Sequence, residues 1–175
     1  MVTIDSFYGM DFKCILADPP WPQKLMGKFK NHGAARQLPY STMTIEEIKS
    51  MLVGKAAADD AHLWLWTTNS FLKEGFDVMK AWGFRYLAPI HWIKPSGIGA
   101  WFVHRTQTLL FGYKKSCRFP MARMKPNIFH ASNPARHSEK PEESYQLIES
   151  ISLCPRLELF ARRKRENWTT WGNEV

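Results

Sequence analysis

Asp18-Pro19-Pro20-Trp21 is the group whose residue types and order point most directly to a reaction. Asp18 and the carbonyl of Pro19 could accept the two N–H groups of an aromatic amine such as N6 of adenine. Such hydrogen bonds draw the nitrogen toward a tetrahedral shape and free its delocalised lone pair to attack a methyl donor. Two consecutive prolines stiffen the loop, so the carbonyl is aimed before the reaction. Trp21 offers a face on which a flipped base can stack, at about 1–3 kcal/mol. The plain alternative is a strand-ending Pro-Pro turn with Trp21 in the core.

A buried strand is expected to end at this tetrapeptide. The apolar run at 12–17 stops at Asp18, and prolines cannot continue a strand ladder. The same reasoning predicts strands over 62–67, 84–93 (closed by Pro95), 105–113 and 156–161, with a short closing segment at 168–171. It predicts helices over 45–53, after a capping box at Thr44, over 71–82, stopped by Gly83, and from Pro141 to before Pro155.

Strands that alternate with helices indicate an α/β fold with a parallel or mixed sheet and helices on both faces. The 175 residues favour one domain over 1–175.

The charge distribution favours a polyanionic partner. Net charge is +8, and no acidic residue lies between Asp77 and Glu139. Asp18 is the only acid from Phe12 to Ile45, which suggests that this carboxylate has a role in an anion-binding site. The alternative is a solvated basic face.

Other features exclude several classes. Three cysteines without C-x-x-C spacing predict neither a disulfide framework nor a zinc site, and we expect no metal. No apolar run approaches membrane-spanning length and no signal-peptide pattern is present, so we expect a cytoplasmic protein that does not enter membranes.

Several ordered motifs resemble the MT-A family of adenine N6-methyltransferases, the family of the mRNA adenosine methyltransferase catalytic subunit and its bacterial and phage relatives. The motifs are ADPPW (17–21), LPYSTM (38–43), LWLWTTN (63–69), HWIKP (91–95), AWFVHRTQTLLFG (100–112), HSEKPEESYQLIE (137–149), LELFARR (157–163) and WTTWGNE (168–174).

The resemblance implies a Rossmann-like, S-adenosylmethionine-dependent methyltransferase in circularly permuted order, with the catalytic motif ahead of the main cofactor-binding strand. Asp18 would adjoin the cofactor, and Lys140, Arg162, Asn173 and Glu174 match residues that bind it. Lys140 also stands at a helix start, where a cation opposes the helix dipole, and a broken local rule often marks function. The run Arg162 to Arg165 could alternatively be a solvated charged segment.

The resemblance also implies a substrate pocket. Tyr40 matches a gate-loop tyrosine near the target base, Trp66 and Trp92 match pocket aromatics, and Lys94 matches a nearby lysine. The two tryptophans lie on strands and could equally be core. Gln107 stands where relatives usually have Glu, which removes a charge. The short connection from Lys94 to Trp101 makes an obligate catalytic–scaffold heterodimer less expected than a monomer or homodimer.

We therefore expect transfer of a methyl group from S-adenosyl-L-methionine to N6 of adenine in a flipped or unpaired base. DNA is favoured because the chain lacks a Cys/His zinc module that could guide RNA. Two basic loops are the expected nucleic-acid contacts: Lys24 to Arg36, and Lys114 to Arg136 with Lys114 and Lys115 at its start. The alternatives are an RNA adenosine N6-methyltransferase, a non-catalytic nucleic-acid-binding subunit, or methylation of cytosine N4 or a protein glutamine.

Overall fold

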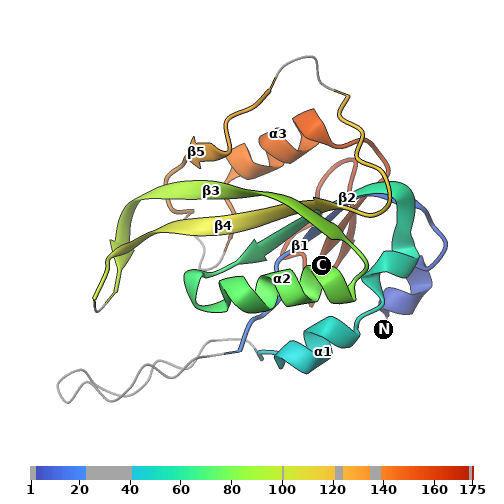
Figure 1. Cartoon of the computed structure of the whole chain (residues 1–175), viewed down its shortest axis with the longest axis horizontal. Helices are drawn as coiled ribbons and strands as arrows, with labels where there is room; N and C mark the ends of the chain where they lie inside the picture. Colours follow the sequence, from blue (N-terminus) through green and yellow to red (C-terminus); the bar gives the residue numbers. More distant parts are fainter. Residues whose placement is uncertain (1–2, 23–40, 100, 121–123, 135–138, 174) are drawn as a thin grey trace.

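The computed structural model describes residues 3–22, 41–99, 101–120, 124–134, 139–173 and 175, and these form one twisted sheet with helices on both faces (Figure 1). The strands are β1 (Phe12–Ala17), β2 (Ala57–Thr67), β3 (Arg85–Ile98), β4 (His104–Tyr113), β5 (Ile128–His130), β6 (Arg156–Leu159) and β7 (Thr169–Trp171). The α-helices are α1 (Ile45–Ser50), α2 (Leu72–Ala81) and α3 (Glu142–Ile151), and Ile4–Phe7, Val53–Ala56 and Asn69–Phe71 are 3₁₀ helices.

The sheet is mixed, with strand order β5-β3-β4-β2-β1-β6-β7. β1 pairs in parallel with both β2 and β6, whereas β4 is antiparallel to β2 and to β3. β4 therefore runs against its neighbours, and the carboxyl ends of β1, β2, β3 and β6 lie at the same edge. This confirms the predicted α/β class with a mixed sheet, of a kind that fits a Rossmann-like methyltransferase. Ligands of such sheets bind outside the carboxyl ends of the strands.

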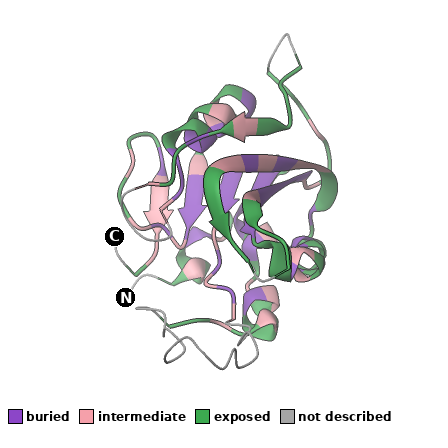
Figure 2. Cartoon of the chain, turned by 90° about the vertical axis from the view of Figure 1, so that its left-hand side faces the viewer, coloured by how far each residue is buried: buried purple, intermediate pink, exposed green. Residues whose placement is uncertain are grey.

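Two apolar layers hold the helices to the sheet. Along β2, Leu63 and Leu65 pack with the α1 and α2 side, while Trp64 and Trp66 pack with α3 on the other side. This alternation follows from the two-residue period of a strand, and burial of both faces explains why β2 is apolar from Leu63 to Trp66. Figure 2 shows the buried residues along the central strands and the exposed ones on the outlying β3–β4 hairpin.

Local signals of helix ends were confirmed. The Thr44 capping box is complete, since its side chain accepts from the N–H of Glu47 and its own N–H donates to the Glu47 carboxylate. Gly83, after α2, has φ +83°, the left-handed conformation that makes glycine a common helix stop. α1 is shorter than predicted, because Met51 leaves the helical conformation.

Three predicted strand boundaries were wrong, and one of them is the end of β6, which stops at Leu159 and not at 161. β2 starts at Ala57, not at His62, and β3 continues through Pro95 to Ile98. Proline is tolerated there because β5 pairs only with His91 to Ile93, so the missing N–H of Pro95 falls outside that ladder. Strand β5 was not predicted, since three residues are too few to carry a periodic pattern.

Candidate active site

Asp18 lies directly after β1 at the carboxyl edge of the sheet. Its carboxylate forms an ion pair with the Nζ of Lys140, 122 residues later in the chain. The Lys140 side chain, just before α3, is 8% exposed, and that of Asp18 is 24% exposed. A buried ammonium requires a partner, and Asp18 provides one while remaining open to solvent on one side. Two residues expected at one site from separate motifs therefore meet.

The loop after Asp18 is fixed by hydrogen bonds. The carbonyl of Pro19 accepts from the N–H of Trp21 at 2.8 Å, and the carbonyl of Pro20 accepts from the N–H of Met43 at 2.9 Å. The first bond holds the direction of the Pro19 carbonyl and leaves it a second lone pair for another donor.

Trp21 is built into the core. It is 8% exposed, its ring stacks on Phe71 with centroids 5.7 Å apart, and its Nε1 donates to the carbonyl of Trp66 at 3.0 Å. The expectation that Trp21 presents an open face to a base is not supported by this burial. Its contacts instead attach the end of the Asp-Pro-Pro loop to β2, so Trp21 holds this loop in position.

A cavity of about 170 Å³ adjoins Asp18. Its lining comes from the ends of β1, β6 and β7 and the start of the α1 segment: Asp18, Pro20, Ser41, Met43, Phe160, Ala161, Arg162, Trp171, Gly172 and Asn173. Arg162 and Asn173, both expected to bind a cofactor, are thus brought to the same cavity as Asp18. Tyr40 and Glu174, the remaining residues expected beside base and cofactor, lie outside the described residues.

The wall of this cavity is aromatic and strained. Phe160 has φ +64°, a conformation that costs a non-glycine residue energy and is concentrated at functional sites. Its ring meets that of Trp171 edge-on at 5.5 Å. With Lys140, Arg162 and Asn173 nearby, the cavity offers a cation, polar hydrogen-bonding groups and two rings. This combination suits a ligand with a carboxylate, hydroxyls and an aromatic ring.

Lys94 is an electrostatic neighbour of both Lys140 and Asp18. Its Nζ is 4.3 Å from the ring centroid of Trp92 and donates to Gln107 Oε1 at 3.2 Å. The pKa of Lys94 is lowered, chiefly by desolvation and also by the positive charge of Lys140, while Asp18 opposes the shift. Gln107 thus accepts a hydrogen bond from Lys94 and leaves its positive charge uncompensated, whereas a glutamate at this position would neutralise that charge.

Trp66 and Trp92 form the floor beneath these two lysines. They are 0% and 2% exposed, and their rings meet edge-on with centroids 6.3 Å apart. The Nζ of Lys140 stands 5.4 Å from the Trp66 ring centroid, a cation–π distance. The two tryptophans are therefore core residues that support the site lysines. Within the described residues, Trp66 Nε1 is buried without a hydrogen-bond partner.

Lys114 and Lys115 lie at the opposite edge of the sheet, because they follow the end of the antiparallel strand β4. Lys114 Nζ donates to the carbonyls of Gly54 and Ala57 at 2.8 and 2.6 Å, and Lys115 pairs with Asp59 at 2.9 Å. The structure thus places these two expected nucleic-acid contacts at the edge opposite Asp18, and their contact with nucleic acid stays a prediction. Their amines brace the start of β2, a role that a count of charges could not reveal. The other expected basic loop, Lys24 to Arg36, lies outside the described residues.

A buried network behind the site was missed. The Oε1 of Glu158, on β6, accepts from the Tyr145 hydroxyl at 2.8 Å, and Arg165 lies 3.7 Å from the Tyr145 ring centroid. Burial raises the pKa of Glu158 above its usual range. Arg163 and Arg165 bind Glu142 in the first turn of α3, so half of the Arg162–Arg165 run is a clamp on that helix. The lone acid within the apolar strand 156–161 was the available signal.

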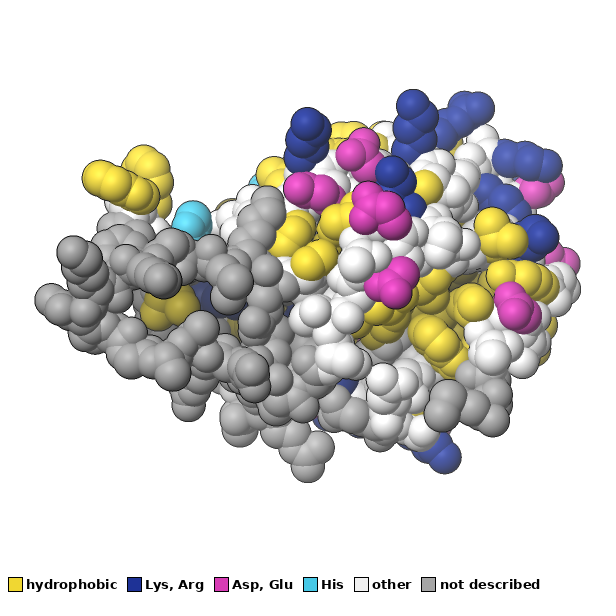
Figure 3. All heavy atoms as spheres, turned by 90° about the horizontal axis from the view of Figure 1, so that it is seen from below, with side chains coloured by type: hydrophobic (Ala, Val, Ile, Leu, Met, Phe, Trp, Pro, Cys, Tyr) yellow, Lys and Arg dark blue, Asp and Glu magenta, His cyan; other side chains and the backbone are white. Residues whose placement is uncertain are grey.

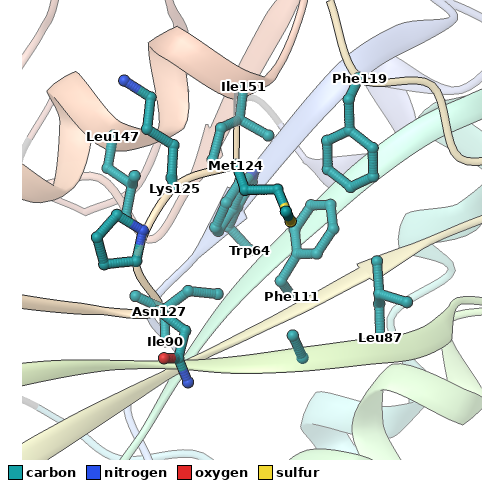
Figure 4. A pocket seen from close by; sticks show the side chains of 12 residues that line it. Trp64, Leu87, Ile90, Phe111, Phe119, Met124, Lys125, Asn127, Leu147 and Ile151 are labelled. Atoms are coloured by element: carbon teal, nitrogen blue, oxygen red, sulfur yellow. The ribbon is translucent and has the colours of Figure 1, made fainter. Parts of the chain in front are cut away.

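A second cavity of about 500 Å³ lies between α3 and the sheet (Figure 4). It is lined mainly by apolar side chains, among them Trp64, Ile90, Phe111, Leu147 and Ile151, which point toward one another in the figure. Its lining contains no carboxylate, and it lies toward the end of the sheet where β3 begins. The predicted catalytic carboxylate, Asp18, lines the first cavity and not this one.

The described residues contain no group of three or more metal-ligating side chains. None of their helices combines the length and the apolar character that a membrane crossing requires.

The model of the MT-A70 family matches residues 12–174. The chain belongs to the MT-A70 family. The resemblance inferred from its motifs is thereby confirmed.

Named relatives of this MT-A70 chain differ in length. It is 30% identical over 94% of its length to the N(6)-adenosine-methyltransferase MT-A70-like protein of Drosophila melanogaster, of which it covers 27%. It is 29% identical to the mouse N(6)-adenine-specific methyltransferase METTL4, covering 38% of that protein. It is 27% identical to the Type II methyltransferase M.MunI of a Mycoplasma species, covering 78%. The chain thus spans about a quarter of the Drosophila relative's length.

Proposed function

We propose that this MT-A70 chain transfers a methyl group from S-adenosylmethionine to N6 of adenine in nucleic acid, with DNA as the preferred polymer. The observation that carries the proposal is the contact between Asp18 and Lys140 beside the cavity that Arg162 and Asn173 line. The names of the relatives, which include an adenosine and an adenine methyltransferase, agree with it.

The residues of the cavity fit S-adenosylmethionine, which would supply an electrophilic methyl group on a sulfonium. Lys140 provides a cation for the methionine carboxylate, a charge-assisted pairing worth more than a neutral hydrogen bond. Arg162 and Asn173 provide hydrogen-bonding groups for ribose and adenine, and Phe160 and Trp171 provide apolar surface for the ring.

Asp18 and Pro19 would act on the amine. The Asp18 carboxylate accepts one N–H of the adenine amine and the free lone pair of the Pro19 carbonyl accepts the other. Because both acceptors are already held in the folded chain, no reorganisation is needed when the nitrogen begins to bond. After transfer the nitrogen carries a positive charge, which Asp18 stabilises until the proton leaves to solvent.

The circularly permuted motif order is part of this proposal, with residues 1–175 acting as one domain. Asp18 follows the first strand of the sheet, whereas the residues assigned to the cofactor, Lys140, Arg162 and Asn173, all follow residue 139. The intact tetrapeptide at 18–21 also disfavours a non-catalytic subunit.

For the polymer, DNA is favoured because the mouse relative is named for adenine rather than adenosine and because M.MunI, a type II methyltransferase, is matched over 78% of its length. RNA is the second candidate, because the Drosophila relative is named an adenosine methyltransferase. We propose a monomer or homodimer.

The test is incubation with isotope-labelled S-adenosylmethionine and unmodified DNA or RNA, followed by nucleoside mass spectrometry. Labelled N6-methyldeoxyadenosine from DNA, in excess of N6-methyladenosine from RNA, is the expected result. Label only in cytosine, or in neither polymer while the cofactor still binds, would refute the assignment.

A further inference from the structure

Four large apolar side chains stand in solvent at the tip of the β3–β4 hairpin. Ile98 is 88%, Trp101 93%, Phe102 78% and Val103 63% exposed. Figure 3 shows hydrophobic side chains protruding at the end of the molecule that carries this hairpin. Isolated exposed apolar residues are normal, but a contiguous group with two aromatic rings marks an interaction surface.

The hairpin is a defined arm. A Cβ on Gly97 would lie 2.1 Å from the carbonyl oxygen of His104, so the two strands approach too closely for any side chain there. Directly after the tip, the Nδ1 of His104 is hydrogen-bonded to the Nδ2 of Asn69 at 2.9 Å, and Arg105 Nε donates to the carbonyl of Lys94 at 3.1 Å. The tip is therefore presented at a set position relative to the sheet.

The arm rises from the edge that carries Asp18. Its base includes Lys94 and Gln107, and Lys94 is an electrostatic neighbour of Asp18 and Lys140. From the Ile93–Thr106 pair, the four residues to Phe102 span roughly 13 Å at about 3.3 Å per residue. β4 lies two strand spacings from β1, about 10 Å, so the aromatic tip is within a few nucleotides of a base held at Asp18.

The charge of the hairpin indicates which partner its exposed tip contacts. No acidic residue lies between Asp77 and Glu139, so the charged side chains of the hairpin itself are all positive, and the whole chain is at +8. A second copy of the chain would bring a like-charged surface against this arm, whereas nucleic acid is complementary to it. Aromatic rings beside cationic side chains are the combination that stacks on unpaired bases.

We propose that Trp101 and Phe102 form an aromatic platform that stacks on unpaired bases flanking the target adenine. This rests on the proposed function, and it extends that function to the form of the substrate: single-stranded or locally opened nucleic acid is bound in preference to closed duplex. Stacking depends on flat rings, so a branched apolar side chain does not replace them.

The test compares three variants with the unmodified chain. Trp101→Leu/Phe102→Leu keeps the apolar surface and removes the rings, Trp101→Phe/Phe102→Tyr keeps rings, and Leu153→Ala removes an exposed apolar side chain elsewhere. Affinity for a fluorescent single-stranded oligonucleotide containing one adenine, and for the same sequence in a duplex, is measured by anisotropy over a range of salt. All substituted side chains are exposed, so folding is unaffected.

The Leu double variant is expected to bind the single strand about fivefold or more weakly, with an unchanged salt slope because no charge is removed. The ring-preserving variant and Leu153→Ala should bind as the unmodified chain does, and S-adenosylmethionine affinity should be equal in all four. Unchanged single-strand affinity of the Leu variant overturns the platform. The platform is also overturned if the Leu double variant loses a dimer seen by sedimentation while its single-strand affinity is unchanged. That result would assign the hairpin tip to contact with a second copy of the chain.

Failure of the proposed function gives a different pattern. In that case the unmodified chain forms no N6-methyladenine in either polymer. A chain that methylates adenine but whose Leu double variant binds the single strand normally refutes the platform alone.

Discussion

The two edges of the sheet both carry lysines and aspartates, yet they differ in what those charges do. At the edge where β4 ends, Lys114 is bonded to two main-chain carbonyls, and Lys115 and Lys13 are paired with Asp59 and Asp60. At the carboxyl edge, Lys140 is nearly buried against Asp18, and Lys94 is bonded to a neutral glutamine beside it.

The lysines at the first edge stabilise the fold, whereas those at the second edge lie beside a candidate binding cavity. Cations at the first edge are neutralised or bonded to backbone, and no expected cofactor residue lies beside them. At the second edge, charge is gathered next to a cavity with polar groups from three strand ends. Charge counts along the chain could not distinguish these edges, because strand direction decides which lysines reach the ligand side.

Removal of Asp18 should have the largest effect. We expect Asp18→Ala to lower the initial rate of N6-methyladenine formation about 10²- to 10³-fold, as the loss of a preorganised hydrogen-bonding group does elsewhere. Asp60→Ala, at the opposite edge, is the matched control and should retain the rate. Equal losses in the two variants would contradict the distinction between the edges.

Replacement of Lys140 should act on the cofactor. A hydrogen bond to a charged group contributes about 1.5–3 kcal/mol, so Lys140→Met should weaken S-adenosylmethionine binding about 10- to 150-fold by calorimetry. Lys13→Met removes an ion-paired lysine at the other edge and should leave that affinity unchanged. An unchanged dissociation constant for Lys140→Met would remove this residue from the cofactor site.

A negative charge placed beside Lys94 should have a moderate effect on nucleic-acid binding. Gln107→Glu would neutralise the lysine that Gln107 now contacts, so the salt slope of single-strand binding should become shallower by about 0.7. Lys115→Glu, at the far edge, should leave affinity and slope unchanged in the same titration. The reverse ranking would move the nucleic-acid surface to the other edge.

The smallest expected effect concerns the stability of the network behind the site. Burial raises the pKa of Glu158 above its ordinary value of 4.5, so the folded chain holds this proton more tightly than the unfolded chain. The protonated Glu158 therefore contributes to stability at pH values below its ordinary pKa. This contribution is lost as the pH rises through the raised pKa of the folded chain. The free energy of unfolding of Glu158→Gln, from denaturant titrations, should therefore fall less over that pH range than that of the unmodified chain. Parallel profiles would show that Glu158 does not titrate there.

Sequence patterns predicted the parts of the fold that are locally determined. The apolar run at 12–17 and the two prolines after it predicted that Asp18 ends a buried strand, and the capping box predicted where α1 begins. The conflict of Lys140 with the helix dipole also marked this residue for attention, and its role at the cofactor stays a prediction. These features need only neighbouring residues.

The remaining features depend on distant pairing. Pro95 is tolerated in β3 because β5 leaves that position unpaired, and Trp21 is buried because Phe71 and Trp66 meet it. The place of Lys114 at the edge opposite Asp18 could not be predicted, because the direction of β4 is set by its partners β2 and β3. None of these features can be read from the hydrophobic periodicity of neighbouring residues.

The most direct test of the central claim is a cycle between Asp18 and the amine of the target base. Binding of an oligonucleotide with one adenine is compared with binding of the same oligonucleotide carrying purine, which lacks the amine, for the unmodified chain and for Asp18→Ala. We expect the unmodified chain to prefer adenine by about tenfold or more and the variant to lose most of this preference. Equal binding of the two bases by the unmodified chain, or a preference that survives in Asp18→Ala, would contradict it.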